Sequence, residues 1–127
     1  MDPLQRVMLV DDSKTMRNIQ RTMLAQMCVP EIEEASDGQD ALSKIGAFRP
    51  ELILVDWNMP TMDGLTFVKH VRSRGMTMPI IMVTTESEKP KVVLAIKAGV
   101  NNYVIKPFTP EALAARIDET MAKRQAA

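Results

Sequence analysis

Acidic residues follow two of the apolar runs in this sequence. Val7-Met8-Leu9-Val10 leads into Asp11 and Asp12, and Leu52-Ile53-Leu54-Val55 leads into Asp56. In an open parallel α/β sheet, the carboxyl ends of the strands form the edge at which ligands bind. Three carboxylates at one edge are costly, because two like charges ~4 Å apart repel by roughly 4 kcal/mol at an effective dielectric of about 20. We therefore predict a site for a hard cation, and a ligand set made only of oxygen favours Mg²⁺ or Mn²⁺ over zinc.

Two further apolar runs end in residues that can bind phosphoryl oxygens. Ile80-Ile81-Met82-Val83 leads into Thr84, and Tyr103-Val104-Ile105 leads into Lys106. A hydroxyl and an ammonium at the same edge of the sheet are donors for the oxygens of a phosphoryl group. Asp56 could be a third metal ligand only, or also a nucleophile that forms an aspartyl phosphate when the charge of that group is neutralised.

Simpler roles for the same side chains remain open at this point. Either Asp11 or Asp12 could cap the helix that begins near Ser13, which accounts for one aspartate but not for two. Lys106 could be a solvent-facing lysine, and Thr84 could be an ordinary strand residue, because threonine is favoured in strands. The gathering of these residues at strand ends favours the site.

The hydrophobic pattern changes between the period of a strand and that of a helix five times. Three of the predicted strands are continuously apolar, as expected when helices cover both faces of a sheet. Strict alternation implies a doubly wound parallel sheet with right-handed crossovers, and the charged segment 31–35 is predicted at an edge. The predicted strands are 6–11, 31–35, 51–56, 79–84 and 102–106, and the predicted helices are 13–28, 38–47, 63–74, 87–98 and 110–124.

Size and composition indicate one soluble domain. The chain has 127 residues, a common size for a single domain, so we expect residues 1–127 to form one. Its 16 basic and 16 acidic residues balance, and the lack of a basic run argues against nucleic-acid binding. The single cysteine, Cys28, excludes an internal disulfide and fits a reducing compartment. Without a signal-peptide pattern or an apolar stretch that could cross a bilayer, we expect a cytoplasmic protein.

Four other side chains are assigned ordinary packing or surface roles. We expect Cys28 to be buried and inert at the end of the first helix, and Trp57 to form a partly exposed lid over the acidic site. His70 is expected on the surface of the third helix, and Phe108 is expected to anchor the fifth helix.

Five segments, in this order, resemble the response-regulator receiver family. The resemblance extends over essentially the whole chain, and the order of the segments is far more specific than any one of them. Within the family the chain is most similar to the stand-alone chemotaxis regulators, which implies a flavodoxin-like, five-stranded sheet of order 2-1-3-4-5 with five flanking helices. The segments are Val10-Asp11-Asp12-Ser13, Val55-Asp56-Trp57-Asn58-Met59-Pro60, Met62-Asp63-Gly64, Met82-Val83-Thr84-Thr85-Glu86 and Tyr103-Val104-Ile105-Lys106-Pro107-Phe108.

The resemblance implies a specific role for each acidic residue. Asp56 would accept a phosphoryl group from the phosphohistidine of a histidine kinase. Asp12 and Asp56 would bind Mg²⁺ directly, Asp11 would act mainly through water, and the backbone carbonyl of Asn58 would complete the protein ligands.

The resemblance also implies roles for residues around the phosphoryl group. Lys106 and the Thr84 hydroxyl would hold its oxygens. Thr84 would shift toward the phosphate on activation, and Tyr103 would turn inward behind it. Asn58 and Glu86 would tune the rate at which the phosphoryl group is lost.

The function that follows is a phosphorylation-driven switch without an output domain of its own, rather than a conventional enzyme. It would catalyse its own phosphorylation and its slow dephosphorylation. Its signal would leave through the surface of the fourth helix, the fifth strand and the fifth helix, to an output protein such as a component of the flagellar motor switch. The expected partners are a histidine kinase, that output protein and, in some systems, a phosphatase, and the expected state is a monomer.

Several alternatives stay open from sequence. The chain could be a phosphate sink or phosphorelay intermediate, or a receiver excised from a longer transcription factor. A flavodoxin-like cofactor-binding protein is disfavoured, because the acidic edge repels an anion and no Gly-rich loop follows the first strand. A metal-dependent phosphohydrolase would need a second general acid or base near Asp56, and none is evident.

The chain departs from the family pattern at two places. Thr85 stands where a small residue such as alanine is usual, and this predicts slower phosphotransfer or hydrolysis. At the start of the fourth helix, the segment Glu88-Lys89-Pro90-Lys91 differs from the enteric chemotaxis regulators, and this surface bears on the choice of partner. The resemblance further implies a cis peptide bond between Lys106 and Pro107, which an X-Pro bond permits.

Overall fold

The computed structural model describes residues 3–126, with ten regular elements that alternate between strand and helix. Every predicted element is present, and the observed ends differ from the predicted ones by no more than two residues. The elements are β1 (Arg6–Val10), α1 (Lys14–Gln26), β2 (Glu31–Ala35), α2 (Gly38–Phe48), β3 (Leu52–Val55), α3 (Gly64–Ser73), β4 (Ile80–Thr84), α4 (Lys89–Ala98), β5 (Asn102–Ile105) and α5 (Pro110–Ala126).

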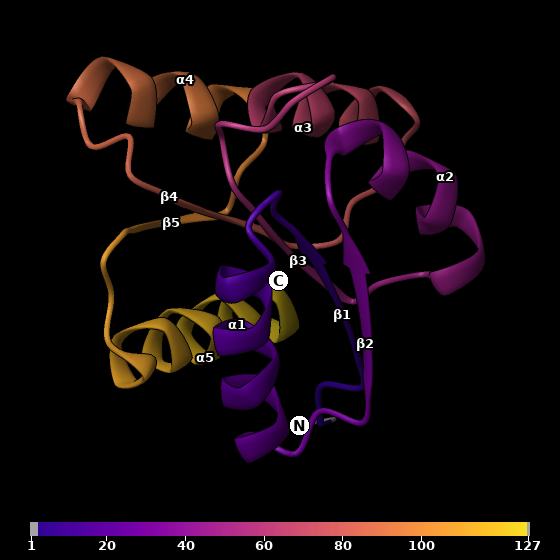
Figure 1. The fold of residues 1–127 in the computed structure, drawn as a ribbon, viewed down its shortest axis with the longest axis vertical. Helices are drawn as coiled ribbons and strands as arrows, with labels where there is room; N and C mark the ends of the chain where they lie inside the picture. Colours follow the sequence, from indigo (N-terminus) through magenta and orange to yellow (C-terminus); the bar gives the residue numbers. More distant parts are fainter. Residues whose placement is uncertain (1–2, 127) are drawn as a thin grey trace.

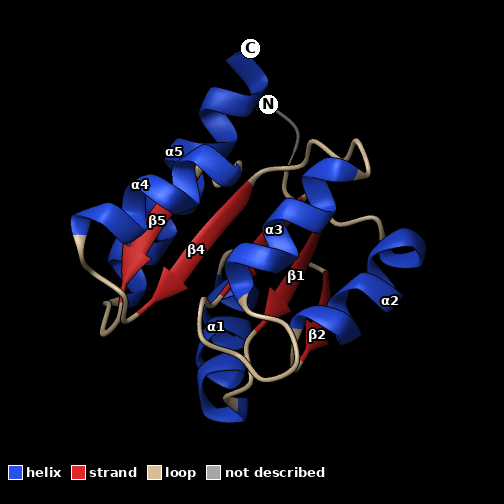
Figure 2. Cartoon of the chain, turned by 90° about the horizontal axis from the view of Figure 1, so that it is seen from above, coloured by secondary structure: helices blue, strands red, loops and turns tan. Residues whose placement is uncertain are grey.

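The five strands form one parallel sheet in the order β2-β1-β3-β4-β5, which confirms the predicted topology. Figure 2 shows the strands running in the same direction, so that their carboxyl ends share one edge. Val10 at the end of β1 pairs with both Ala35 and Val55. Because Val10 and Val55 are paired, the residues that follow them, Asp11 and Asp56, lie next to each other.

Helices cover both faces of the sheet and create two hydrophobic cores. In Figure 1, α1 and α5 lie on one side of the sheet, and α2, α3 and α4 lie on the other. Alternate residues along each central strand serve the two cores, so that Met8 and Ile53 face the α2–α4 side while Leu9 and Leu52 face the α1 and α5 side. Burial on both faces explains why the central strands are continuously apolar.

Capping residues and a first-turn proline mark where the helices begin and end. Thr109 caps α5, because its Oγ1 accepts a hydrogen bond from the N–H of Ala112 at 3.1 Å. Pro90 lies in the first turn of α4, and Gly99 ends that helix with φ of 118°. These positions match the predicted capping signals.

Strand β2 is an edge strand, as its charge predicts. Glu34 on β2 accepts hydrogen bonds from Arg17 at 2.9 Å and from Arg21 at 3.2 Å, both on α1. The Glu34 carboxylate of β2 is therefore paired with two arginines of the neighbouring helix.

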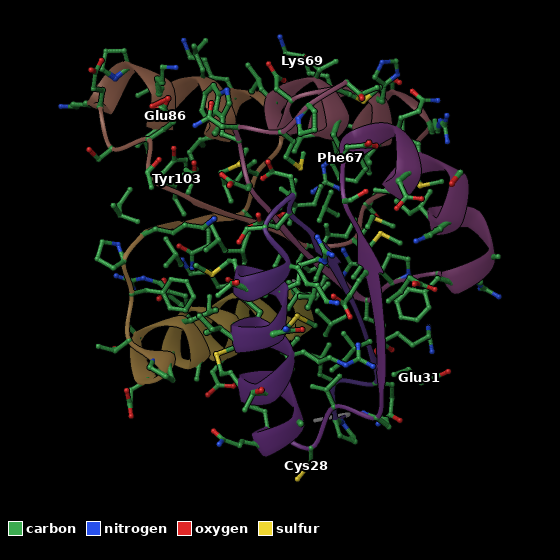
Figure 3. The ribbon with its side chains drawn as sticks, in the orientation of Figure 1. Cys28, Glu31, Phe67, Lys69, Glu86 and Tyr103 are labelled. Carbon is green, nitrogen blue, oxygen red and sulfur yellow. The ribbon has the colours of Figure 1, made fainter. Side chains whose placement is uncertain are left out.

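The environment of Cys28 differs from the prediction. The side chain is exposed, and Figure 3 shows it at the end of α1 and pointing away from the body of the protein. Helix α1 ends at Gln26, and Cys28 has a left-handed φ of 65°. Because the chain leaves the helix before Cys28, that side chain is no longer on the buried face. His70 is exposed and Phe108 packs against the core beside α5, as predicted.

Candidate functional site

Three carboxylates meet at the carboxyl edge of the sheet. Asp11 and Asp12 follow β1 and Asp56 follows β3, and one oxygen from each lies within 4.8 Å of the others. Asp11 is buried, with 2% of its surface exposed, whereas Asp56 is half-buried and Asp12 is exposed. The donor set consists only of carboxylate oxygens, so these residues fit a hard divalent cation such as Mg²⁺.

Lys106 brings a positive charge into the acidic cluster from the end of β5. Its Nζ lies 2.8 Å from Asp11 Oδ2 and 3.0 Å from Asp56 Oδ2. Burial raises the pKa of Asp11, and the hydrogen bonds from Lys106 and from the Ser13 N–H only partly oppose that rise. Burial alone would lower the pKa of Lys106, but its hydrogen bonds to Asp11 and Asp56 outweigh burial and raise it. Lys106 is therefore a charged ammonium at neutral pH and not a solvent-facing lysine.

The loop after β1 is held by its own side chains and by α1. Ser13, and not an aspartate, caps α1, because its Oγ accepts a hydrogen bond from the Met16 N–H at 3.1 Å. Asp11 instead accepts a hydrogen bond from the Ser13 N–H at 2.9 Å. Arg17 donates to the backbone carbonyl of Asp11 at 2.6 Å. Capping of α1 therefore does not explain either aspartate.

The loop after β3 folds tightly against α3. Asp63 caps α3 by accepting a hydrogen bond from the Thr66 N–H at 2.8 Å, and Gly64 donates its N–H to the Trp57 carbonyl at 2.8 Å. A Cβ at position 64 would collide with the backbone carbonyl of Asp56, so glycine is required for this close approach. The Asn58 N–H lies 3.4 Å from Asp56 Oδ1. The loop thus places the backbone of Asn58 beside the carboxylate of Asp56.

Trp57 does not form the partly exposed lid that we predicted. Only 6% of its surface is exposed, and the ring belongs to the core that also contains Phe67. Met59 and Met62 of the same loop pack against this core as well. Because the loop folds back onto α3, the residue after Asp56 is drawn inside. The ammonium of Lys91, on α4, lies over the Trp57 ring at 5.0 Å from its centroid.

Thr84, Glu86 and Tyr103 form a connected group beside the acidic cluster. The Thr84 side chain is fully buried, and its Oγ1 lies 3.4 Å from the Glu86 N–H. The Tyr103 hydroxyl donates to the Glu86 carbonyl at 2.7 Å, and Figure 3 shows these two residues close together near the start of α4. Burial, with smaller contributions from the charges of Glu86 and Asp56, raises the pKa of Tyr103 to about 12. The phenol is therefore a hydrogen-bond donor at neutral pH.

Sequence reasoning placed the main groups of the site correctly and missed two cations beside it. The structure gathers Asp11, Asp12, Asp56 and Lys106 at one edge, as predicted from the strand ends. Contacts of Arg17 with the Asp11 carbonyl and of Lys91 with Trp57 were not anticipated. A local signal existed for Lys91, because a cation in the first turn of a helix opposes the helix dipole. The peptide bond between Lys106 and Pro107 is cis, as the resemblance implied.

Comparison with known proteins assigns this arrangement to a family. The response regulator receiver domain matches residues 7–118. Chemotaxis protein CheY1 of Helicobacter pylori is 46% identical over 116 residues, which cover 89% of this chain and 94% of that protein. The chemotaxis protein CheY homolog of Campylobacter jejuni is 43% identical over 119 residues, covering 91% and 92%.

Solved structures give the same assignment. Chemotaxis protein CheY4 of Vibrio cholerae superposes with a TM-score of 0.85 at 36% identity, over 92% of this chain and 98% of that one. A CheY-like receiver domain protein from Methanospirillum hungatei gives a TM-score of 0.88 at 27% identity, over 97% and 98%. None of the helices in the described part of the chain is long and apolar enough to cross a membrane. With its sheet order, its acidic edge and these relatives, the chain belongs to the response regulator receiver family, whose members are phospho-acceptor signalling proteins.

Proposed function

We propose that Asp56 is the phospho-acceptor of a chemotaxis response regulator that works in the cytoplasm. The observation that carries this proposal is the position of Lys106, whose ammonium contacts both Asp56 and the buried Asp11. An ammonium held beside a carboxylate nucleophile stabilises the charge of an incoming phosphoryl group. The chemotaxis proteins among the relatives support the biological setting.

The reaction is the transfer of a phosphoryl group from nitrogen to oxygen. An Asp56 carboxylate oxygen forms a bond to phosphorus as the bond between phosphorus and a histidine-kinase imidazole breaks, and the imidazole nitrogen takes up a proton. The signal ends by hydrolysis. A water oxygen attacks phosphorus, the aspartyl P–O bond breaks, and inorganic phosphate leaves. Asp56 returns as a carboxylate, so the protein catalyses both its own phosphorylation and its dephosphorylation.

The residues around Asp56 would bind the metal ion and orient the phosphoryl group. Bound Mg²⁺, held by Asp12, Asp56, the Asn58 carbonyl and, through water, Asp11, would neutralise phosphoryl charge. Lys106 holds one phosphoryl oxygen as a fixed positive charge.

The residues beside the phosphoryl group form the conformational switch and set how long the phosphoryl group persists. The Thr84 hydroxyl turns from the Glu86 N–H toward the phosphoryl group, and Tyr103 packs behind it, which gives two packings that phosphate biases. Asn58 and Glu86 stand at the open side of the site and tune the access of water.

The signal leaves through the surface of α4, β5 and α5. Large apolar side chains lie exposed there, with 51% of the surface of Leu94, 49% of Ile96 and 40% of Ile105 accessible. Large apolar side chains exposed on neighbouring elements favour a protein partner. We assign this surface to an output protein such as a component of the flagellar motor switch, and we take the monomer to be the acting form. A phosphate sink without an output partner would not need this apolar surface.

The test is direct phosphorylation of the purified chain with acetyl phosphate and Mg²⁺. The expected result is the mass of one added phosphoryl group, lost on treatment with hydroxylamine because acyl phosphates are cleaved by it. Asp56→Asn should abolish the gain, whereas Asp63→Asn, which keeps the cap of α3, should retain it. A phosphoryl group that persists in Asp56→Asn would show that the acceptor is another residue.

A further inference from the structure

Lys91 occupies a position that the rules of helix formation disfavour. It lies in the first turn of α4, which contains no acidic residue and whose N-cap residue, Glu88, makes no side-chain capping hydrogen bond. A cation at this end of a helix is repelled by the helix dipole. Residues that break a local rule in this way are often kept for a function.

Two contacts compensate for that unfavourable position. The Nζ of Lys91 lies 3.3 Å from Glu86 Oε1 and 5.0 Å from the centroid of the Trp57 ring. Trp57 is the residue after the proposed acceptor Asp56, and it is 6% exposed. The ammonium of Lys91 therefore connects the start of α4 with Trp57 in the loop after β3 and with Glu86 in the loop after β4.

Glu86 extends this connection to the switch residues. Its carbonyl accepts the hydrogen bond of the Tyr103 hydroxyl at 2.7 Å, and its N–H faces Thr84 Oγ1 at 3.4 Å. By holding the Glu86 side chain, Lys91 fixes the backbone group that receives Tyr103. We propose that Lys91 is a positioning residue, which stabilises the packing with Tyr103 bound to Glu86 and so couples Asp56 to α4. This inference rests on the proposed function, in which Tyr103 packs behind Thr84 in the phosphorylated chain, and we assign the bond from the Tyr103 hydroxyl to the Glu86 carbonyl to that packing.

The experiment separates metal binding from the coupled packing. The full chain, labelled with ¹⁵N, is titrated first with Mg²⁺ alone and then, at saturating Mg²⁺, with beryllium fluoride as a mimic of the phosphoryl group. The amides of Asp12 and Asn58 report the site, and those of Tyr103 and Ile105 report β5. The variants are Lys91→Met, which keeps an apolar side chain without charge, and Lys91→Arg, which keeps the charge and the stacking on the ring.

We expect Lys91→Met to bind Mg²⁺ within about twofold of the unmodified chain, since Lys91 contacts none of the three aspartates. The beryllium fluoride concentration at half-saturation should rise about fivefold, the factor that one cation–π contact and one partly exposed ion pair supply together. Lys91→Arg should give a half-saturation concentration close to that of the unmodified chain. Lys89→Met, which removes the same charge from an exposed residue in the same turn, should have no effect.

Each contrary outcome identifies what has failed. A half-saturation in Lys91→Met equal to that of the unmodified chain would reduce Lys91 to a surface ion pair and overturn the inference. A loss of Mg²⁺ affinity as large as the loss for beryllium fluoride would also overturn it, because the damage would then be general. Absence of any response to beryllium fluoride in the unmodified chain would overturn the proposed function itself.

Discussion

The ammonium of Lys106 lies 2.8 Å from the carboxylate of Asp11, although 95 residues separate the two in sequence. Asp11 is 2% exposed, so this pair lies inside the protein. Removing one member of a buried pair leaves the other charge uncompensated. The two residues therefore contribute to the stability of the fold as well as to the chemistry of the site.

Replacing Lys106 should destabilise the metal-free protein. In Lys106→Met the three carboxylates lose the only ammonium that is bonded to them within the described residues. We therefore expect the free energy of unfolding, measured in urea at pH 7, to fall by about 3 kcal/mol. Saturating Mg²⁺ should restore part of the loss, because a second cation offsets the carboxylates. Lys97→Met, at an exposed position of α4, serves as control. Equal stability of the two variants would show that the Lys106 contacts contribute nothing to the fold.

Replacing Asp12 should have the opposite effect on stability. Its exposed carboxylate lies in the acidic cluster, whereas the bonds of Lys106 go to Asp11 and Asp56. Asp12→Asn should raise the stability of the metal-free protein by about 1 kcal/mol. It should also reduce the gain in melting temperature with millimolar Mg²⁺, while Asp118→Asn on α5 should change neither quantity. An undiminished response to Mg²⁺ in Asp12→Asn would exclude Asp12 as a ligand.

Thr61 stores backbone strain in the loop that follows Asp56. Its φ is 69°, a conformation that β-branched residues rarely adopt. Thr61→Gly should therefore stabilise the protein by about 1 kcal/mol in chemical denaturation. Thr66→Gly, the same change inside α3, should cost about 0.3 kcal/mol. A loss of stability in both variants would mean that Thr61 is not strained.

Gln20 is a polar residue at a buried position of α1. It is 2% exposed, and its Oε1 has no hydrogen-bond partner among the described residues. Gln20→Met should increase stability by about 1 kcal/mol, since a methionine of similar length buries no unsatisfied oxygen. Gln26→Met, at an exposed position of the same helix, should be neutral. If Gln20→Met is no more stable, the oxygen is satisfied by water.

Tyr103 should titrate at unusually high pH. Burial raises its pKa to about 12, and the charge of Glu86 contributes. Because Tyr103 is the only tyrosine, the absorbance of its phenolate reports this pKa directly. The folded state holds the proton more tightly than the unfolded state, so this contribution to stability is complete below about pH 10 and is lost as the pH rises toward 12. Glu86→Gln should lower the midpoint, and a midpoint near 10 in the unmodified chain would show that the phenol is not buried in solution.

The sheet and the acidic cluster were accessible from sequence because each depends on a local rule. Continuously apolar strands and helical spacing determine the elements, and parallel strands bring their carboxyl ends to one edge. Asp11, Asp56 and Lys106 each follow directly after a strand, so the positions of the strands determine the positions of these residues.

The environments of Trp57 and Cys28 were not accessible in this way. The burial of Trp57 depends on how the loop after β3 closes on α3, where the N–H of Gly64 meets the Trp57 carbonyl. The exposure of Cys28 depends on where α1 ends, and its left-handed φ turns the chain away from the helix. Both are tertiary outcomes that hydrophobic periodicity does not encode.

The contact between α3 and the Asp56 carbonyl has a consequence for how this sequence can vary. No side chain fits at Gly64 without moving the backbone of Asp56, whereas a side chain at Gly46 meets nothing within 4 Å. In a library of all substitutions selected for signalling, position 46 should therefore accept most residues and position 64 almost none. Mutational tolerance would then trace the backbone that holds the acceptor, independently of the charged residues that surround it.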